Sequence, residues 1–237
     1  MERLLSIIYI LAIKFADVTL TEIVDVMYED PVKLKYSKTR LPIALRFIDT
    51  EKFTIIRPIS ERPYDLGFVG RFEKEKGLHD FVIAIKMLYG RGMKPHVLIV
   101  GSGSLAYFMR KNLQELNNVK IISYVPHKEM PDIYNKIKIL VLPSRKEGVP
   151  TVLLEALACG VIPVVSKVGG MPWLIQRVGV GVLLDNFSSK FIVNALEYLL
   201  SLGLEELNEM SQRCSRFIKE HFTLDRAVAR YKLLKMT

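Results

Sequence analysis

Residues 139 to 165 read I-L-V-L-P-S-R-K-E-G-V-P-T-V-L-L-E-A-L-A-C-G-V-I-P-V-V, in which two apolar runs flank a polar loop and a helical stretch. The first run ends at Pro143, and the second follows Gly160. Short apolar runs that alternate with amphipathic stretches are typical of buried parallel strands joined by crossover helices. This segment therefore predicts one strand–loop–helix–strand unit of an α/β sheet.

The same alternation extends in both directions from this unit. Strand-like runs are expected at Leu66–Val69, Val97–Val100, Val119–Ile122, Ile139–Leu142, Val161–Val165 and Val182–Leu184. Between the first two runs, apolar residues recur at helical spacing and predict a helix with one core-facing side: Leu78, Phe81, Val82, Ile85, Leu88 and Tyr89. We therefore expect residues 63–237 to form an α/β domain with a doubly wound, Rossmann-like parallel sheet.

Residues 1–62 have a different composition and read as a fragment followed by a linker rather than as a domain. The uncharged stretch 4–13 is too short to span a bilayer as a helix, and prolines interrupt residues 30–64. Apolar side chains in residues 1–28 occupy more than one helical face. We expect that surface to be covered by a partner chain, a second copy or a membrane interface, unless both faces fold onto the α/β domain.

Composition limits the classes of function. Half of the residues are hydrophobic, so the chain can bury a substantial core, and its net charge of +9 suits an anionic ligand. No run of five Lys or Arg and no aromatic RNA-binding signature occurs, so we expect no nucleic-acid partner. Cys159 and Cys214 lack C-x-x-C spacing, which suits a reducing, cytoplasmic compartment. The histidines show no metal-ligand spacing, and we assign none of them a catalytic role.

The loops that follow the strands are the candidate binding segments, because ligands of open α/β sheets lie beyond the carboxyl ends of the strands. The first loop, G-R-F-E-K-E-K-G at 70–77, places two cations, Arg71 and Lys76, where they can clamp a diphosphate. The alternative is an ordinary solvated turn. In G-S-G-S at 101–104, Gly101 and Gly103 let the backbone approach a ligand closely, although a tight strand-to-helix turn explains them as well.

The loop after the fourth strand is the most specific segment. Thr151 is expected as the N-cap of a helix whose first N–H groups, near Val152, can hold a phosphate. Glu147 in the loop and Glu155 in the helix are separated by seven residues, so both can point at one ligand. The alternative makes Glu155 an acid that the helix dipole favours and Glu147 a surface residue.

Taken in order, these motifs resemble the nucleotide-binding domain of the retaining GT-B glycosyltransferases of family four, which include bacterial and archaeal mannosyl- and glucosyltransferases. G-R-F-E-K-E-K-G resembles the phosphate-clamping loop of that family, I-V-G-S-G its second strand and turn, and residues 142–165 its paired-glutamate signature. H-F-T-L-D-R-A-V-A-R-Y at 221–231 resembles the terminal helix that in relatives crosses back to the N-terminal domain. The resemblance runs from about Leu66 to the end of the chain.

The resemblance implies a hexosyltransferase of the kind used in polysaccharide biosynthesis, with a UDP-sugar or GDP-sugar as donor. It implies no metal or other cofactor, because cationic side chains and helix amides take that role. The expected donor-binding residues are Arg71, Lys76, Gly101, Gly103, Tyr124, Val125, Glu147, Thr151, Val152 and Glu155, and the expected catalytic ones are Glu147, Arg71 and Lys76.

Each of these residues takes a role from the resemblance. Arg71 and Lys76 would contact the diphosphate, and Glu147 would lie beside the transferred sugar. The backbone at Thr151 and Val152 would meet the distal phosphate. The base would lie near Tyr124 and Val125, and Glu155 would hold the ribose.

Two departures from the family pattern bear on activity. F-I-D-T-E-K-F at 47–53 resembles the interdomain segment, but Arg46 and Phe47 stand before Ile48 where relatives commonly have Asn-Gly. With this landmark, the resemblance implies that residues 1–42 are the tail of an N-terminal domain, and we expect more than half of that domain to be missing together with its acceptor-side glycine loop and histidine. In G-G-M-P-W-L-I at 169–175, Trp173 stands where relatives usually have Glu, which puts full catalytic competence in doubt.

Three functions compete at this point. The first is a glycosyltransferase donor-binding half that transfers sugar with a partner supplying the acceptor half. The second is a noncatalytic sugar-nucleotide-binding or scaffold protein. The third is a nucleotide-sugar epimerase of the same fold, which also needs a complete cleft between two domains.

Overall fold

The computed structural model describes residues 19–20, 40–41 and 46–234, with side chains described for residues 46–229. Residues 48–221 form one compact unit, and residues 1–47 together with 222–237 form another. In the second unit β1 (Thr19–Leu20) pairs in parallel with β2 (Arg40–Leu41), and α11 spans Leu224–Leu234. The surface expected on residues 1–28 lies outside the described residues, apart from β1.

A six-stranded, all-parallel sheet forms the centre of the unit 48–221, as the alternation of apolar runs predicts. Its strands lie in the order β5-β4-β3-β6-β7-β8. The strands are β3 (Tyr64–Val69), β4 (Val97–Val100), β5 (Val119–Ile122), β6 (Ile137–Leu142), β7 (Ile162–Ser166) and β8 (Val182–Leu184). The four central strands are buried almost throughout, because helices cover both faces of a parallel sheet.

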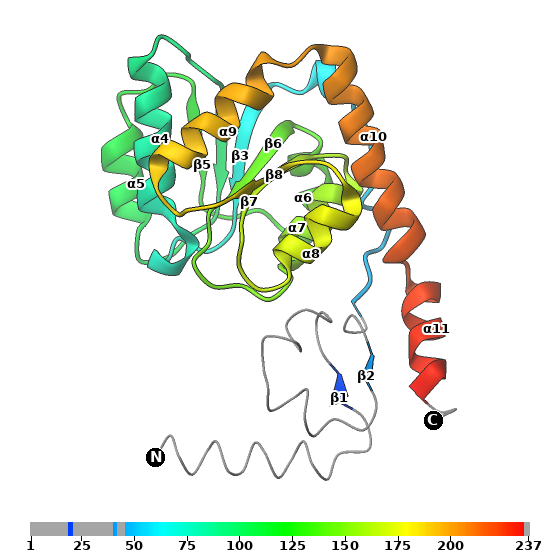
Figure 1. Cartoon of the computed structure of the whole chain (residues 1–237). Helices are drawn as coiled ribbons and strands as arrows, with labels where there is room; N and C mark the ends of the chain where they lie inside the picture. The colour runs from blue at the N-terminus through cyan, green and yellow to red at the C-terminus, as the bar shows by residue number, and fades with distance from the viewer. Residues whose placement is uncertain (1–18, 21–39, 42–45, 235–237) are drawn as a thin grey trace, which may run out of the picture. The chain divides into compact units, whose positions relative to one another are not determined.

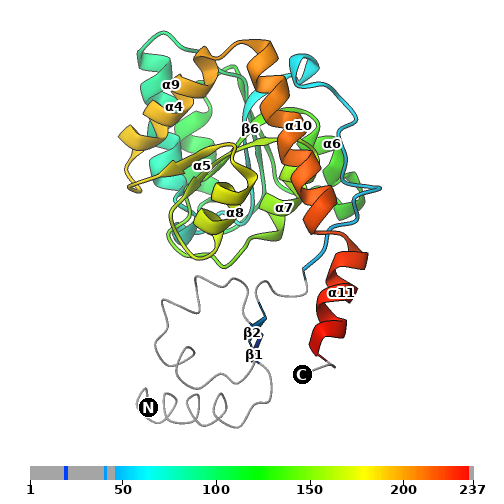
Figure 2. The ribbon, with the colours of Figure 1, turned by 45° about the vertical axis from the view of Figure 1, so that its right-hand side comes forward.

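Helices flank this sheet on both sides (Figure 1). One face carries α4 (Leu78–Gly90), α5 (Ala106–Leu113) and α9 (Ser189–Ser201), with α4 packed on both of the others. The other face carries α6 (Met130–Tyr134), α7 (Thr151–Ala158) and α10 (Leu204–His221), and Figure 2 shows α10 running along α7. α8 (Met171–Val178) follows β7. Among the described helices, none combines the length and the apolar character needed to cross a membrane.

All six strands are parallel, but the side on which the chain adds successive strands changes between β3 and β6. From β3 the chain proceeds to β4 and β5 on one side, and from β6 it proceeds to β7 and β8 on the other. The loops that leave β3 and β6 therefore diverge at neighbouring strand ends and leave a crevice between them. This topological switch point is the place where open α/β sheets bind their ligands.

A buried arginine ties the segment before the sheet to the end of α7. Arg62 is only 2% exposed. Its guanidinium donates hydrogen bonds to the carbonyl oxygens of Cys159 (2.7 Å), Gly160 (3.2 Å) and Ile137 (2.9 Å). Burial lowers the pKa of Arg62 to about 10. The compact unit thus begins at Ile48, earlier than the boundary expected at residue 63, because residues before β3 are part of its core.

At the other end of α7, the turn after β7 packs directly on the loop after β6. The N–H of Gly170 donates to the carbonyl of Gly148 at 3.0 Å. Gly169 has a φ of +54°, and a Cβ added there would lie 2.1 Å from the carbonyl oxygen of Glu147. Only glycine fits at this contact. The contact therefore fixes the position of the loop that carries Glu147 relative to the turn after β7.

Replacing Arg62 with alanine is expected to lower the free energy of unfolding by about 2–4 kcal/mol. Three buried carbonyl oxygens lose a charged donor, and the recovered desolvation of the guanidinium offsets only part of that loss. Thermal or urea unfolding measures the change. Arg57→Ala is the matched control, because the Arg57 side chain is exposed, and it should change stability by less than about 0.5 kcal/mol. Equal stability of the two variants would contradict the anchoring role of Arg62.

Gly169→Ala is expected to destabilise the unit by about 2–4 kcal/mol, through a left-handed φ at a non-glycine residue and a backbone clash with Glu147. Gly90→Ala is the control, since nothing lies within 4 Å of a Cβ added at this last residue of α4. It should be neutral or stabilising by up to about 1 kcal/mol. Urea titration of both variants checks the difference, and a tolerated Gly169→Ala would show that the loop has room to move.

Candidate functional site

The loops after β3 and β6 are joined by backbone contacts. Gly77 ends the short helix η2 (Lys74–Lys76) with a φ of +70°, and a Cβ there would lie 2.0 Å from the carbonyl oxygen of Pro143. The N–H of Arg145 donates to the carbonyl of Glu75 at 2.7 Å. These contacts place η2 against the end of β6. Lys76 of the first loop therefore lies next to Glu147 of the second loop.

Lys76 and Glu147 form an ion pair at the floor of the crevice. The Lys76 Nζ lies 2.6 Å from Oε1 of Glu147, and the two side chains are only 17% and 12% exposed. The Ser144 hydroxyl donates to the same oxygen at 2.8 Å. Glu147 is therefore held in one orientation from two sides. Ser144, three residues before Glu147, is not among the residues expected from the sequence.

Arg71 remains available to a ligand. Its side chain is 72% exposed, and its closest acidic neighbour, Glu75, lies 3.6 Å away. An exposed pair of this length contributes little to stability. Glu73, by contrast, is engaged by the next loop, since the hydroxyl and the N–H of Ser104 both donate to its carboxylate. These hydrogen bonds lower the pKa of Glu73.

Two cavities open at this edge of the sheet and share Val69, Gly70 and Arg71. One has a volume of about 210 Å³ and is lined by Phe68, Val69, Gly70, Arg71, Lys76, Leu142, Glu147, Pro150 and Val152. The other, of about 280 Å³, is lined by Val69, Gly70, Arg71, Val100, Gly101, Ser102, Ser123, Tyr124, Val125 and Met130. Arg71 thus stands between a charged compartment and one lined by the ends of β4 and β5.

α7 points its N-terminus at the charged cavity, although its cap differs from the expected one. The helix begins at Thr151, and Pro150 is the N-cap, so the expectation of Thr151 as the cap was wrong. Pro150 takes this place because its ring fixes an extended entry (φ −67°), and its carbonyl accepts from Leu153 at 3.0 Å. The first-turn N–H groups still face the cavity that Val152 lines.

Glu155 is placed differently from Glu147. Its side chain is buried, with an exposed fraction of 5%. The Tyr134 hydroxyl donates to Oε2 at 2.8 Å, and Nε2 of His127 lies 2.8 Å from Oε1. Burial, with the Glu155 carboxylate next to it, raises the pKa of Tyr134. Sequence reasoning gave His127 no role and did not consider Tyr134; nothing in their spacing from Glu155 indicates the contact.

The remaining expected residues divide between the cavities and the scaffold. Gly101, Tyr124 and Val125 line the larger cavity, with Tyr124 exposed to solvent. Gly103 lies against Phe72 and Glu73 instead, where a Cβ would clash with both. Trp173 packs into the unit, and the Arg177 guanidinium lies 4.7 Å from its ring centre.

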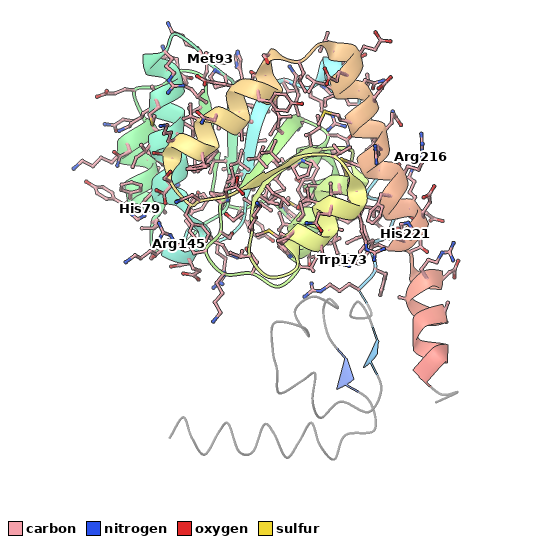
Figure 3. The ribbon with its side chains drawn as sticks, viewed as in Figure 1. His79, Met93, Arg145, Trp173, Arg216 and His221 are labelled. Carbon is pink, nitrogen blue, oxygen red and sulfur yellow. The ribbon has the colours of Figure 1, made fainter. Side chains whose placement is uncertain are left out.

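Figure 3 shows at which edge of the unit Arg145, in the loop after β6, lies. Arg145 and Trp173 lie toward the same edge of the unit as His79, which is at the start of α4. Met93, before β4, lies at the opposite edge. Arg145 itself binds Asp80 at 2.9 Å. The cavities therefore lie where strand carboxyl ends and helix N-termini meet. Two cations, helix N–H groups and the fixed carboxylate of Glu147 at such an edge suit a ligand that carries both phosphates and hydroxyl groups. Among the described residues, no group of three or more His, Cys, Asp or Glu side chains could hold a metal ion.

Proteins of similar sequence carry glycosyltransferase names. The chain is 30% identical over 188 residues to a D-inositol 3-phosphate glycosyltransferase of Corynebacterium urealyticum, a match that covers 69% of this chain and 44% of the relative. It is 26% identical over 220 residues to an Escherichia coli UDP-Gal:alpha-D-GlcNAc-diphosphoundecaprenol alpha-1,3-galactosyltransferase, covering 87% of this chain and 54% of the relative. The chain thus spans about half the length of these two relatives.

Solved structures share the fold. A sucrose-phosphate synthase from Thermosynechococcus elongatus superposes with a TM-score of 0.78 at 18% identity, over 97% of this chain and 60% of that one. The C-terminal domain of a group 1 glycosyltransferase from Francisella tularensis gives a TM-score of 0.64 at 23% identity, over 74% of this chain and 98% of that one. The family model described as glycosyl transferases group 1 matches residues 49–221. The chain therefore belongs to the group 1 glycosyltransferases, with a domain of the GT-B, family-four type.

Proposed function

We propose that residues 48–221 bind a nucleoside-diphosphate sugar and act as the donor-binding half of a retaining hexosyltransferase. The observation that carries this proposal is the convergence of Arg71, Lys76, Glu147 and the N-terminus of α7 on one cavity of about 210 Å³. The diphosphate would lie between the two cations and the helix N–H groups. In this position they offset the negative charge that gathers on the leaving phosphate.

The two adjoining cavities divide the donor. The base would occupy the larger one, beside Tyr124 and Val125, and the diphosphate would pass Arg71, which lines both cavities. The sugar would lie beside Glu147, whose carboxylate is held by Lys76 and Ser144. The ribose hydroxyls would bind Glu155. The chain's own cations supply the positive charge, so the proposed reaction uses no metal ion, and UDP-hexoses and GDP-hexoses are the donors to test first.

The acceptor site is proposed to come from outside residues 48–221. The chain covers 44% and 54% of the two relatives described above, and one of them is named for a diphosphoundecaprenol-linked acceptor. A partner protein, or a second copy engaged through residues 1–28, would supply the acceptor wall in the cytoplasm. A peripheral membrane contact would suit a lipid-linked acceptor.

A noncatalytic sugar-nucleotide-binding protein is the second candidate. It is favoured by Trp173, which packs beneath Arg177 at a position where relatives usually carry a glutamate. Such a protein would retain Arg71, Lys76 and Glu155 for binding. Nucleotide affinity is common to both candidates, whereas turnover in the presence of an acceptor domain separates them.

A nucleoside diphosphate is expected to stabilise the protein. At a free concentration of about a hundred times its dissociation constant, ligand binding adds about 2.7 kcal/mol, or roughly 5–10 °C in Tm for a chain of this size. A thermal-shift series with UDP, GDP, ADP and their sugars measures this. The absence of a shift with every nucleotide at millimolar concentration would overturn the proposal.

Lys76→Ala tests the phosphate contact within the same series. Affinity should fall by roughly 1.5–3 kcal/mol, because a charge-assisted hydrogen bond to phosphate is lost. Lys94→Ala is the matched control: this exposed lysine lies in the turn before β4, at the other edge of the sheet, and its loss should leave affinity unchanged. Equal affinities of the two variants would make 70–77 an ordinary solvated turn.

The isolated chain is expected to turn over no donor above the uncatalysed rate. Orientation of two reactants can contribute about 7–11 kcal/mol to catalysis, and a site with one wall forfeits much of that contribution. Release of UDP or GDP from nucleotide sugars, followed by chromatography, measures turnover. Efficient turnover by purified chain that Glu147→Gln abolishes would show instead that this chain completes its own site.

A further inference from the structure

The carboxylate of Glu155 already has a protein partner on each oxygen. Tyr134 donates to Oε2 from α6, and His127 contacts Oε1 from the short helix η3 (His127–Glu129), each at 2.8 Å. The side chain is otherwise enclosed, with 5% of the residue exposed. A hydroxyl group that is to bind Glu155 must therefore find room beside one of these partners or replace it.

The two partners differ in how easily they can leave. Tyr134 is completely buried, so moving it would orphan its hydroxyl and open a void in the core. The His127 side chain is 74% exposed and rests on one side against Phe53, with ring centres 5.5 Å apart. Its imidazole can rotate toward solvent and form hydrogen bonds with water. The contact with Glu155 therefore contributes little net free energy.

His127 adjoins residues that line the larger cavity, although neither His127 nor Glu155 is part of the lining itself. Tyr124 and Val125, which line that cavity, directly precede Pro126 and His127, and Met130, which begins α6, lines it as well. His127 is therefore the removable partner of Glu155 on the side from which a nucleotide would arrive.

We propose that His127 is a latch on Glu155, and that the ribose hydroxyls of the donor take Oε1 by displacing the imidazole while Tyr134 keeps Oε2. The inference rests on the donor binding proposed above. His127 acts through Glu155 and is a positioning residue. The latch lowers the affinity for ribonucleotides, which must open it, and leaves the affinity for nucleotides without ribose hydroxyls unchanged.

The test compares UDP, GDP and ADP with their 2′,3′-dideoxy counterparts by calorimetry on the full chain. His127→Ala should tighten binding of the ribonucleotide about two- to fivefold, the net strength of one hydrogen bond, and should not change binding of the dideoxy form. The ratio of the two affinities therefore rises. His127→Gln, whose amide N–H can donate to Oε1 of Glu155, should return the ratio toward that of the unmodified chain.

His96→Ala serves as the control, since this exposed histidine precedes β4 at the opposite edge of the sheet and should change neither affinity. A ratio that falls in His127→Ala would make the imidazole a support for the ribose site and overturn the latch. An unchanged ratio, with nucleotides still binding, would overturn the latch and leave donor binding intact. Failure of every nucleotide to bind the unmodified chain would remove both proposals.

Discussion

The position of α7 is the constraint on which the rest of the site depends, and a buried cation fixes it. Arg62 donates to the last carbonyls of the helix, and the Ser211 hydroxyl of α10 binds the Gly160 carbonyl at 2.7 Å. A positive charge at a helix C-terminus is favourable, which offsets part of the cost of burying a guanidinium among carbonyl groups rather than beside a carboxylate. With its end held, α7 can direct its first N–H groups and Glu155 toward the strand ends.

The other end of α7 is fixed by backbone rather than by charge. The turn at Gly169 and Gly170 presses on the loop that carries Glu147, and Gly77 presses on Pro143. These approaches leave no room for a Cβ, so the three loops at the switch point keep a constant spacing. That spacing brings Lys76 within 2.6 Å of Glu147, although 70 residues separate them in the chain. The sheet topology thus creates the crevice, and the glycine contacts determine which side chains of the loops lie next to each other in it.

Sequence patterns predicted the sheet well because strands covered on both faces must be apolar, and a buried strand such as Val97–Val100 can be recognised directly. They also predicted that the loops after the strands lie at one edge of the sheet, since parallel strand ends share one edge. They failed where the partner is a main-chain atom or a distant side chain. Arg62 looks like any linker arginine, and its acceptors are carbonyl groups of β6 and of the two residues that follow α7. His127 reaches Glu155 only through the packing of α6 on α7. Pro150 replaced Thr151 as the cap because its fixed φ suits the entry.

The two glutamates of one motif therefore have different chemistry despite their regular spacing. Glu147 lies in a loop, and its ion pair with Lys76 must be shared or broken when a phosphate approaches that lysine. Glu155 lies inside a helix packed against the core, and its orientation is set by Tyr134. In the proposed complex Lys76 and Glu155 each share or give up a partner within the protein when they receive the donor, whereas Arg71 is already available. Binding is then an exchange of hydrogen bonds at nearly constant number, so its net free energy depends on how cheaply the displaced groups return to water. Lys76 is mostly buried, whereas His127 is exposed. The phosphate must therefore offset a larger free-energy cost of breaking internal contacts than the ribose.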